Sequence, residues 1–502
     1  MTAEPTPLDG SARTQAELGD GAPALASEGA ALRPTGAFPP WARLAGRARE
    51  LAAHRLGRQL AWVVGPFAIQ QVIRLAGSLV LTRLLAPEVF GLMLLVNTLR
   101  TGTELLSDLG IGQSVVRSPH GEDRRFLDVA FTLQLLRGVL LTAIMLLAAA
   151  PIAALYEKPE LGPIVLAMAP IFILTGLQSP ALFLNQRRME LRSRATYDLA
   201  GTIVGLAITI ALAAAIPNIW GLVFGLLAST AFSTALSYLL GERRLPRLAW
   251  DPRFVSEIVG FGKWIFLSTA IYFAATSYDK MYFVAAVPIA LAGIFGVART
   301  FSDMFAQLAQ RAGAFLVFPK VAAMGDRRDA AMAARLRATR LKTLALVALA
   351  TGLAVAGSDR FILLAYDARY HGAAFMIPVM FVGVWFAILS AFGDSMLMGA
   401  GKPAAGAWAN AAKFATMLVG LPLALARGDF LAALLVLVAA EIARWLALLP
   451  ASRREKLAHP FDDILLTLLM AVSALAFKVA LGALGLVPTI AQWWALRGLV
   501  HG

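Results

Sequence analysis

The chain has 502 residues, of which 59% are hydrophobic and 15% are charged, with a formal net charge of +14 and a mean hydropathy of +0.70. A soluble protein carries about 25% charged residues, so this composition excludes an ordinary soluble domain. The absence of cysteine excludes disulfides and thiol catalysis. The few histidines are too far apart in sequence for a helical metal-binding pair, so we expect no metal and no other cofactor.

The amino-terminal region precedes the first apolar run. Residues 1–40 are rich in Ala, Gly, Pro and Thr without periodicity, which predicts a disordered cytoplasmic tail. Residues 41–58 carry five arginines and predict an amphipathic helix beside the membrane surface.

Long apolar runs recur from residue 60 nearly to the carboxyl end, each long enough to cross roughly 30 Å of hydrocarbon as a helix. We place spans near 60–84, 90–114, 126–154, 161–184, 197–216, 219–241, 258–277, 284–317, 343–364, 372–398, 404–425, 429–450 and 461–484. A shorter apolar piece, 486–500, contains Trp493 and Trp494, so it is either one more span or an interfacial helix.

The loop charges orient these spans. With the amino terminus inside, basic clusters such as those in 187–194 and 320–342 fall in inside loops, whereas outside loops hold scattered basic residues. This bias predicts a multi-pass protein of a bacterial cytoplasmic (inner) membrane with a cytoplasmic amino terminus. It also accounts for the net positive charge without a nucleic-acid partner.

Two observations predict that the chain is not an enzyme. The longest outside loop, roughly 359–371, is too short for a soluble catalytic domain. Gly399 to Lys402 is followed by Pro403, so this glycine-rich run is not a nucleotide-binding P-loop.

The spans divide into two halves. We expect an all-α fold with two six-helix lobes, 59–241 and 258–450, related as an internal repeat around a central cavity. The basic stretch 242–257 would be a cytoplasmic linker, and 451–502 would add one or two carboxy-terminal helices. The second span of each half begins near a glycine, Gly91 and Gly293 respectively.

Polar residues within the spans indicate function, because a charge at mid-membrane costs roughly 2.5–3.5 kcal/mol on insertion scales. In the first span, Gln70 and Gln71 lie on the same face as Arg74, near mid-span. We favour a cavity-lining role for this face over structural pairing.

The second span carries Arg100, Glu104 and Asp108, spaced by four along one helical face. An internal Arg100–Glu104 pair explains two of them without any function, and would leave Asp108 without a partner in the helix. A functional role and a purely structural role are about equally supported for Arg100. A functional role is slightly favoured for Glu104 and Asp108.

The eighth span carries the strongest pattern, Arg299, Asp303, Gln307 and Arg311 at intervals of four. Four polar positions on one face are difficult to explain as lipid contact, so we expect a cavity lining rather than a network between helices.

Other spans carry weaker candidates. Lys263 lies near the inner end of the seventh span and could extend to the interface, while Asp279 lies near its outer end. Glu441 and Arg444 are spaced as a pair within one helix, for which a structural role is expected.

Residues 74–91 end a leucine-rich helix in Leu-Leu-Ala-Pro-Glu-Val-Phe-Gly, and residues 108–117 follow with Leu-Gly and a closing Arg. These two stretches resemble the oligosaccharide flippases of bacterial polysaccharide biosynthesis, in the superfamily that also contains multidrug and toxin extrusion transporters. Tyr278-Asp279-Lys280 is also similar to the family. The resemblance in topology covers about 60 to 450.

The resemblance implies a cavity lined by the first, second, seventh and eighth spans. Its cations, Arg74, Arg100, Lys263, Arg299 and Arg311, would hold the diphosphate of a polyprenyl-pyrophosphate-linked oligosaccharide. The carboxylates Glu104, Asp108, Asp279 and Asp303 would carry a coupling H+ or Na+ or balance charge, with Gln70, Gln71 and Gln307 as polar lining.

The implied function is to flip this lipid from the inner to the outer leaflet by alternating access, for exopolysaccharide, capsule or O-antigen synthesis. The partners would be membrane lipids, a polysaccharide polymerase and glycosyltransferases. Two alternatives stay open, namely an ion-coupled multidrug antiporter of the same superfamily and a non-transporting scaffold of a polysaccharide machine.

Overall fold

The computed structural model describes residues 65–500 apart from 109, 189, 241–244, 313–316, 318–320, 322–329 and 458. Side chains are additionally left undescribed at 191, 261–268, 309, 312 and 330–333. The expected tail over 1–40 and amphipathic segment over 41–58 lie outside the described residues.

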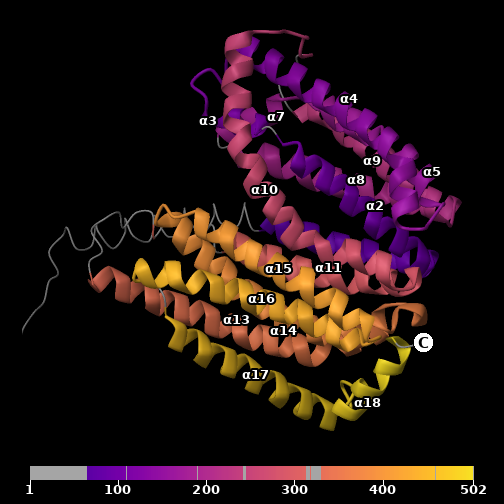
Figure 1. The fold of residues 1–502 in the computed structure, drawn as a ribbon, viewed down its shortest axis with the longest axis vertical. Coiled ribbons are helices and arrows are strands. Elements are labelled where there is room, and N and C mark those ends of the chain that lie inside the picture. Colours follow the sequence, from indigo (N-terminus) through magenta and orange to yellow (C-terminus); the bar gives the residue numbers. More distant parts are fainter. Residues whose placement is uncertain are drawn as a thin grey trace, which may run out of the picture. The chain divides into compact units, whose positions relative to one another are not determined.

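The amino-terminal lobe begins with a helix over residues 65–84. It continues with α2 (Pro87–Leu106), α3 (Ile111–Arg117), α4 (Arg124–Leu155), α5 (Leu161–Met168), α6 (Ile171–Gly176), α7 (Ala181–Arg187), α8 (Leu191–Ala215) and α9 (Ile219–Leu240) (Figure 1).

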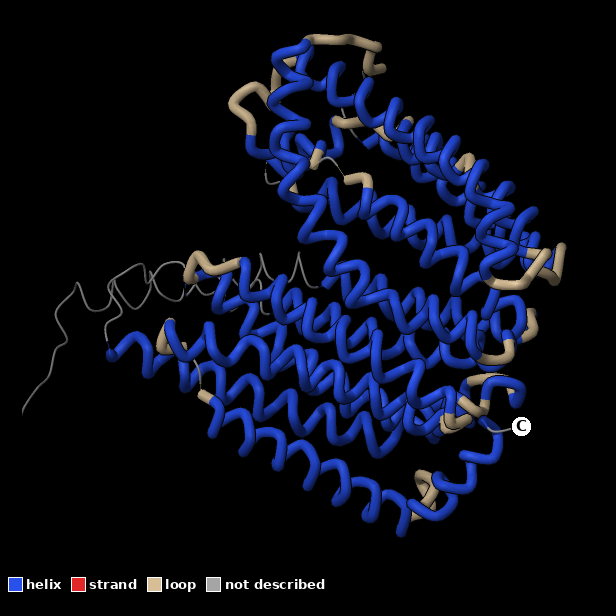
Figure 2. The backbone as a smooth tube through the Cα atoms, viewed as in Figure 1, coloured by secondary structure: helices blue, strands red, loops and turns tan. Residues whose placement is uncertain are grey.

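The carboxy-terminal lobe comprises α10 (Pro252–Ala286), α11 (Ile289–Ala312), α13 (Ala330–Ala365), η2 (Ala368–Tyr370), α14 (Ala373–Gly399), α15 (Ala404–Ala426) and α16 (Phe430–Arg454). It is followed by α17 (Pro460–Ala483), α18 (Ile490–Ala495) and η3 (Leu496–Val500). Figure 2 shows no strand in the described part of the chain. The all-α architecture with two lobes is therefore confirmed.

Nine helices in the described residues are long and apolar enough to cross a membrane, or up to ten if a bent pair counts as one span. Helix α2 is also 20 residues long, and its Arg100 and Glu104 make it more polar. Large apolar side chains such as Phe461, Leu468 and Val472 remain exposed along α17, as expected for a surface that faces lipid.

Three predicted spans are interrupted where the sequence disfavours a helix. The span over 90–114 breaks at 107–110, where Gly110 adopts a left-handed φ of 64°. The span over 161–184 is three short helices, and it bends by 57° before α7, next to Pro180. Pro288 separates α10 from α11, so α11 begins later than predicted.

The two lobes are in close contact where α2 and α11 begin. A Cβ atom added to Gly91 would lie 2.2 Å from the carbonyl oxygen of Ile289. One added to Gly293 would lie 1.9 Å from the carbonyl oxygen of Pro87. These reciprocal contacts explain why both helices have a glycine near their start, since any larger residue would force them apart.

The carboxy-terminal segment 486–500 forms the short helices α18 and η3 and not a further span. Trp493 stacks on Phe375 of α14 with ring centroids 5.1 Å apart, and the side chain of Trp494 is half exposed. Of the two predictions for this segment, the interfacial helix therefore fits its length and aromatic residues better.

Candidate functional site

Four charged side chains meet where α10 faces α11. Arg299 Nε lies 2.9 Å from Asp279 Oδ2 and 3.4 Å from Asp303 Oδ1. Lys280 Nζ donates a 2.8 Å hydrogen bond to Oδ2 of the same Asp303. Asp279 is fully buried, whereas 30% of the Asp303 side chain is exposed. Two cations and two carboxylates therefore form one neutral cluster, which we call the α10–α11 cluster.

The ion pairs continue into the carboxy-terminal lobe. Lys413 of α15 lies 2.5 Å from Glu441 of α16, and Arg444 of α16 lies 2.5 Å from Asp394 of α14. Glu441 and Arg444, which are spaced as a pair within α16, each form an ion pair with a residue of a neighbouring helix. Both are buried, and a buried charge requires such a partner.

A compartment of about 230 Å³ is lined by charged members of these pairs and of the α10–α11 cluster and by Gln307; the charged members are Lys280, Arg299, Asp303, Lys413, Glu441 and Arg444. The predicted stripe on α11 is thus only partly a cavity lining. Arg299, Asp303 and Gln307 face the compartment, but the guanidinium of Arg311 lies 3.8 Å above the Phe67 ring as a cation–π contact.

Arg74 contrasts with these paired cations. Its side chain is exposed to space between the lobes and makes no hydrogen bond or ion pair with any described residue. It lines a compartment of about 560 Å³ with Lys280, and a smaller one of about 170 Å³ with Gln71 and Asp303. An unpaired cation in a cavity is available to a ligand.

The three compartments share lining residues, and we refer to them together as the central cavity. Thr101 and Lys280 line both the 230 Å³ and the 560 Å³ compartments, and Arg74 joins the latter to the third. No acidic residue of the described chain lines the 560 Å³ compartment. Much of its remaining wall is apolar, with side chains such as Met93, Leu206 and Leu222.

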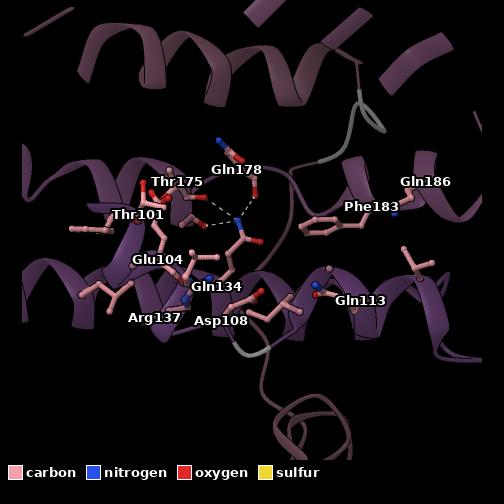
Figure 3. Close-up of a pocket in the computed structure, with 18 of the residues that line it drawn as sticks. Thr101, Glu104, Asp108, Gln113, Gln134, Arg137, Thr175, Gln178, Phe183 and Gln186 are labelled. Carbon is pink, nitrogen blue, oxygen red and sulfur yellow. Dashed lines mark hydrogen bonds between the residues drawn. The ribbon is translucent and has the colours of Figure 1, made fainter. Parts of the chain in front are cut away.

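Glu104 and Asp108 lie elsewhere, on a separate cavity of about 590 Å³ inside the amino-terminal lobe (Figure 3). Arg100 Nη1 donates a 3.2 Å hydrogen bond to Glu104, as in the purely structural interpretation. Asp108 lies beyond the end of α2, where its Oδ1 accepts a 2.9 Å bond from the Gly110 amide. The predicted polar stripe on this helix therefore ends at Glu104.

Two further candidates have other positions. Gln70 Nε2 donates 3.0 Å to the Asp198 carbonyl and 2.7 Å to Thr202 Oγ1, which ties the first helix to α8. Lys263 belongs to α10, but its side chain lies outside the described part of the chain.

A short segment before α14 joins the lobes beside the α2–α11 crossing. The Tyr366 hydroxyl donates 3.1 Å to Ser78 Oγ, and the Tyr370 hydroxyl donates 2.9 Å to the Leu85 carbonyl. Arg369 donates to the Thr82 carbonyl at 3.4 Å. Burial raises the pKa of Tyr366 to about 12 and also raises that of Tyr370. We call these contacts the 366–370 bridge.

Comparison with known proteins agrees with this architecture. A family model described as "Polysaccharide biosynthesis protein" matches residues 80–374. The chain belongs to this family. The resemblance inferred from residues 74–91 and 108–117 is therefore confirmed.

Solved structures show that this polysaccharide biosynthesis protein has the fold of transporters of the MOP superfamily. The lipid II flippase MurJ, inward closed, matches with a TM-score of 0.69 and 11% identity over 87% of this chain and 95% of that chain. An inward-facing multidrug resistance MATE family transporter matches with a TM-score of 0.60 and 15% identity over 84% and 99%. No curated protein sequence matches significantly.

Some site residues were not identified from the sequence of this family member. Lys280 lies beyond residue 277, where the predicted seventh span ends, but α10 continues to Ala286, so the charge of Lys280 lies within the helix. In the sequence, Lys413 is only a weak candidate in the middle of the span over 404–425, whereas the structure pairs it with Glu441 of another helix. The only sequence signal for either residue was a charge inside an apolar run.

Proposed function

We propose that this polysaccharide biosynthesis protein moves a polyprenyl-pyrophosphate-linked oligosaccharide from the inner to the outer leaflet by alternating access. The observation that carries the proposal is Arg74, an unpaired cation on a compartment that also exposes Lys280 and has no acidic lining in the described residues. Two cations on one wall suit a diphosphate, and the planar guanidinium can bind it through two donors.

The shape of the lining supports an amphiphilic cargo. Arg74 and Lys280 share the 560 Å³ compartment with apolar side chains from α2, α8 and α9, including Met93, Leu206 and Leu222. A lipid diphosphate combines an anionic head with an apolar chain. The head would contact the two cations, and the chain would contact the apolar side chains. A small hydrophilic solute would leave the apolar wall without a partner.

The α10–α11 cluster supplies a mechanism for charge balance. Asp303 already neutralises Lys280 when the cavity is empty, and it is the partly exposed carboxylate of the cluster. An arriving diphosphate would compete with Asp303 for Lys280, and the released carboxylate could then take up a coupling H+ or Na+. The cost of keeping charges in the membrane would be low both with and without cargo.

An ion-coupled antiporter for organic cations is the alternative, and one observation favours it. Glu104 and Asp108 line the amino-terminal cavity, where a cationic drug could be neutralised. The two functions differ in the residues that they require, since the antiporter needs the carboxylates and the flippase needs Arg74.

The test is transport in proteoliposomes by Arg74→Ala, with Arg83→Ala as the matched control on an exposed position of the same helix. Polyprenyl-pyrophosphate-linked oligosaccharide from the source organism's membranes is the cargo, and its arrival in the opposite leaflet is measured with an impermeant sugar-oxidising reagent. We expect Arg74→Ala to lose transport and Arg83→Ala to retain it. Equal transport by both variants would refute the proposal, and organic-cation transport lost in Glu104→Gln would support the antiporter.

The proposed direction depends on a cytoplasmic amino terminus. Because the chain lacks cysteine, Glu190→Cys reports the side of the loop between α7 and α8 without background. We expect an impermeant maleimide to label this residue only after the cells are permeabilised. Labelling of intact cells would reverse the orientation.

A further inference from the structure

The amino-terminal cavity has a lining unlike that of the central cavity. It is formed by α2, α3, α4, α6 and α7 and encloses about 590 Å³, within the roughly 300–1,000 Å³ of small-molecule sites. Four glutamines line it, namely Gln113, Gln134, Gln178 and Gln186. Figure 3 shows them around the same space as Thr101 and Phe183.

The charged groups of this cavity already have partners. Arg137 donates a 3.0 Å hydrogen bond to Ser107 Oγ and a second one to the Glu104 carbonyl. The Glu104 carboxylate is paired with Arg100, and that of Asp108 accepts from the Gly110 amide. These charges are therefore already held by protein groups, and an ion that bound here would have to compete with those groups.

The free hydrogen-bonding capacity is neutral. Gln134 Nε2 donates to the carbonyls of Thr175 at 3.0 Å and Gln178 at 3.1 Å, which fixes its amide plane. The side chains of Gln113 and Gln186 are exposed to the cavity and make no hydrogen bond with any described residue. An amide offers both donors and an acceptor, which is what a hydroxyl group requires.

The lining also contains apolar and aromatic side chains beside the amides. The Phe183 ring lies over Gly112, whose added Cβ would be 2.6 Å from it, and Ile111 and Phe172 also line the space. A pyranose ring has hydroxyls at its edge and C–H groups on its faces, so it can use amides and an aromatic surface together.

We propose that this cavity binds neutral sugar units of the transported lipid. The inference rests on the proposed function, because the diphosphate would lie at Arg74 and Lys280 in the central cavity. Thr101 lines both cavities, so one cargo could extend from one to the other around α2. The amino-terminal lobe would then select the sugar, while the central cavity selects the lipid diphosphate.

Single cysteines in the cysteine-free chain test this division. Gln186→Cys reports on the amino-terminal cavity and Ser78→Cys on the central one. Labelling by a small maleimide is measured with the source organism's glycolipid, with sugar-free polyprenyl pyrophosphate, and with Na+. At ten times the dissociation constant, the glycolipid should slow labelling at both positions by about tenfold. The sugar-free lipid should slow it at position 78 alone.

The outcomes separate the two proposals. Protection at position 78 by both lipids and at position 186 by neither overturns the sugar site and leaves the flippase intact. Protection at neither position refutes the proposed function as well. Protection at position 186 by Na+ without the glycolipid identifies an ion site and overturns the inference. As a second measurement, Gln113→Leu should weaken glycolipid binding roughly five- to tenfold and leave binding of the sugar-free lipid unchanged.

Discussion

Arg299 Nε lies 2.9 Å from the carboxylate of Asp279, and Asp279 is fully buried. Arg74, on the first helix of the other lobe, is exposed and has no partner among the described residues. From the sequence, both arginines were candidates for binding the cargo. Their environments in the structure indicate different roles. Arg299 compensates a buried charge, whereas Arg74 is available to a ligand.

Replacing Arg299 by alanine should therefore destabilise the protein before it affects transport. Asp279 would be left as an uncompensated buried charge, which costs roughly 3–5 kcal/mol. We expect a large fall in the melting temperature of the detergent-solubilised protein, and substantial recovery when Arg299→Gln is combined with Asp279→Asn. Arg360→Ala, at an exposed position of α13, is the control. An unchanged melting temperature for Arg299→Ala would contradict the assignment.

Gly293→Ala should separate α2 from α11. The added methyl would lie 1.9 Å from the Pro87 carbonyl oxygen, and a backbone atom cannot move aside cheaply. Overpacking of this kind typically costs about 1–3 kcal/mol, so the thermal stability should fall. Gly357→Ala is the matched control, because an added Cβ there meets nothing within 4 Å. Gly357→Ala should stabilise its helix slightly, because alanine has a higher helix propensity than glycine. Equal changes in thermal stability at both glycines would argue against the close crossing of α2 and α11.

Tyr370→Phe should weaken the 366–370 bridge. The change removes the hydrogen bond to the Leu85 carbonyl and leaves that buried acceptor unsatisfied, a loss of about 1–3 kcal/mol. Thr82→Cys lies buried beneath the bridge and should be labelled from outside at least roughly fivefold faster in the variant. Tyr156→Phe is the control, because the Tyr156 hydroxyl makes no hydrogen bond in the described residues. If both variants label equally, the bridge does not hold the lobes together.

The bridge should also depend on pH, but only at high pH. Burial raises the pKa of Tyr366 to about 12, against roughly 10 for a free tyrosine. The stabilisation is therefore complete below pH about 10 and is lost as the pH rises toward 12, because the separated form releases its proton first. Labelling of Thr82→Cys, corrected with an exposed cysteine, should accelerate over this range and less so in Tyr366→Phe. Acceleration near neutral pH would point to another group.

The sequence by itself determined the class of protein and its helices, because lipid permits only helices with self-satisfied backbones, and these require apolar runs of a fixed length. It also indicated Arg74, Arg299 and Asp303 as candidates, since a charge within a membrane span carries an insertion cost. Gly110, Pro180 and Pro288 can be recognised in the sequence as residues that disfavour a helix. Whether each one interrupts a span depended on the packing around it.

Only the tertiary structure decided which charges pair and which face space. Helical spacing relates residues on one helix, so it correctly paired Arg100 with Glu104. It could not pair Lys413 with Glu441, because partners on different helices depend on how those helices cross. For the same reason, the separation of one expected cavity into a central and an amino-terminal cavity on either side of α2 was decided by packing.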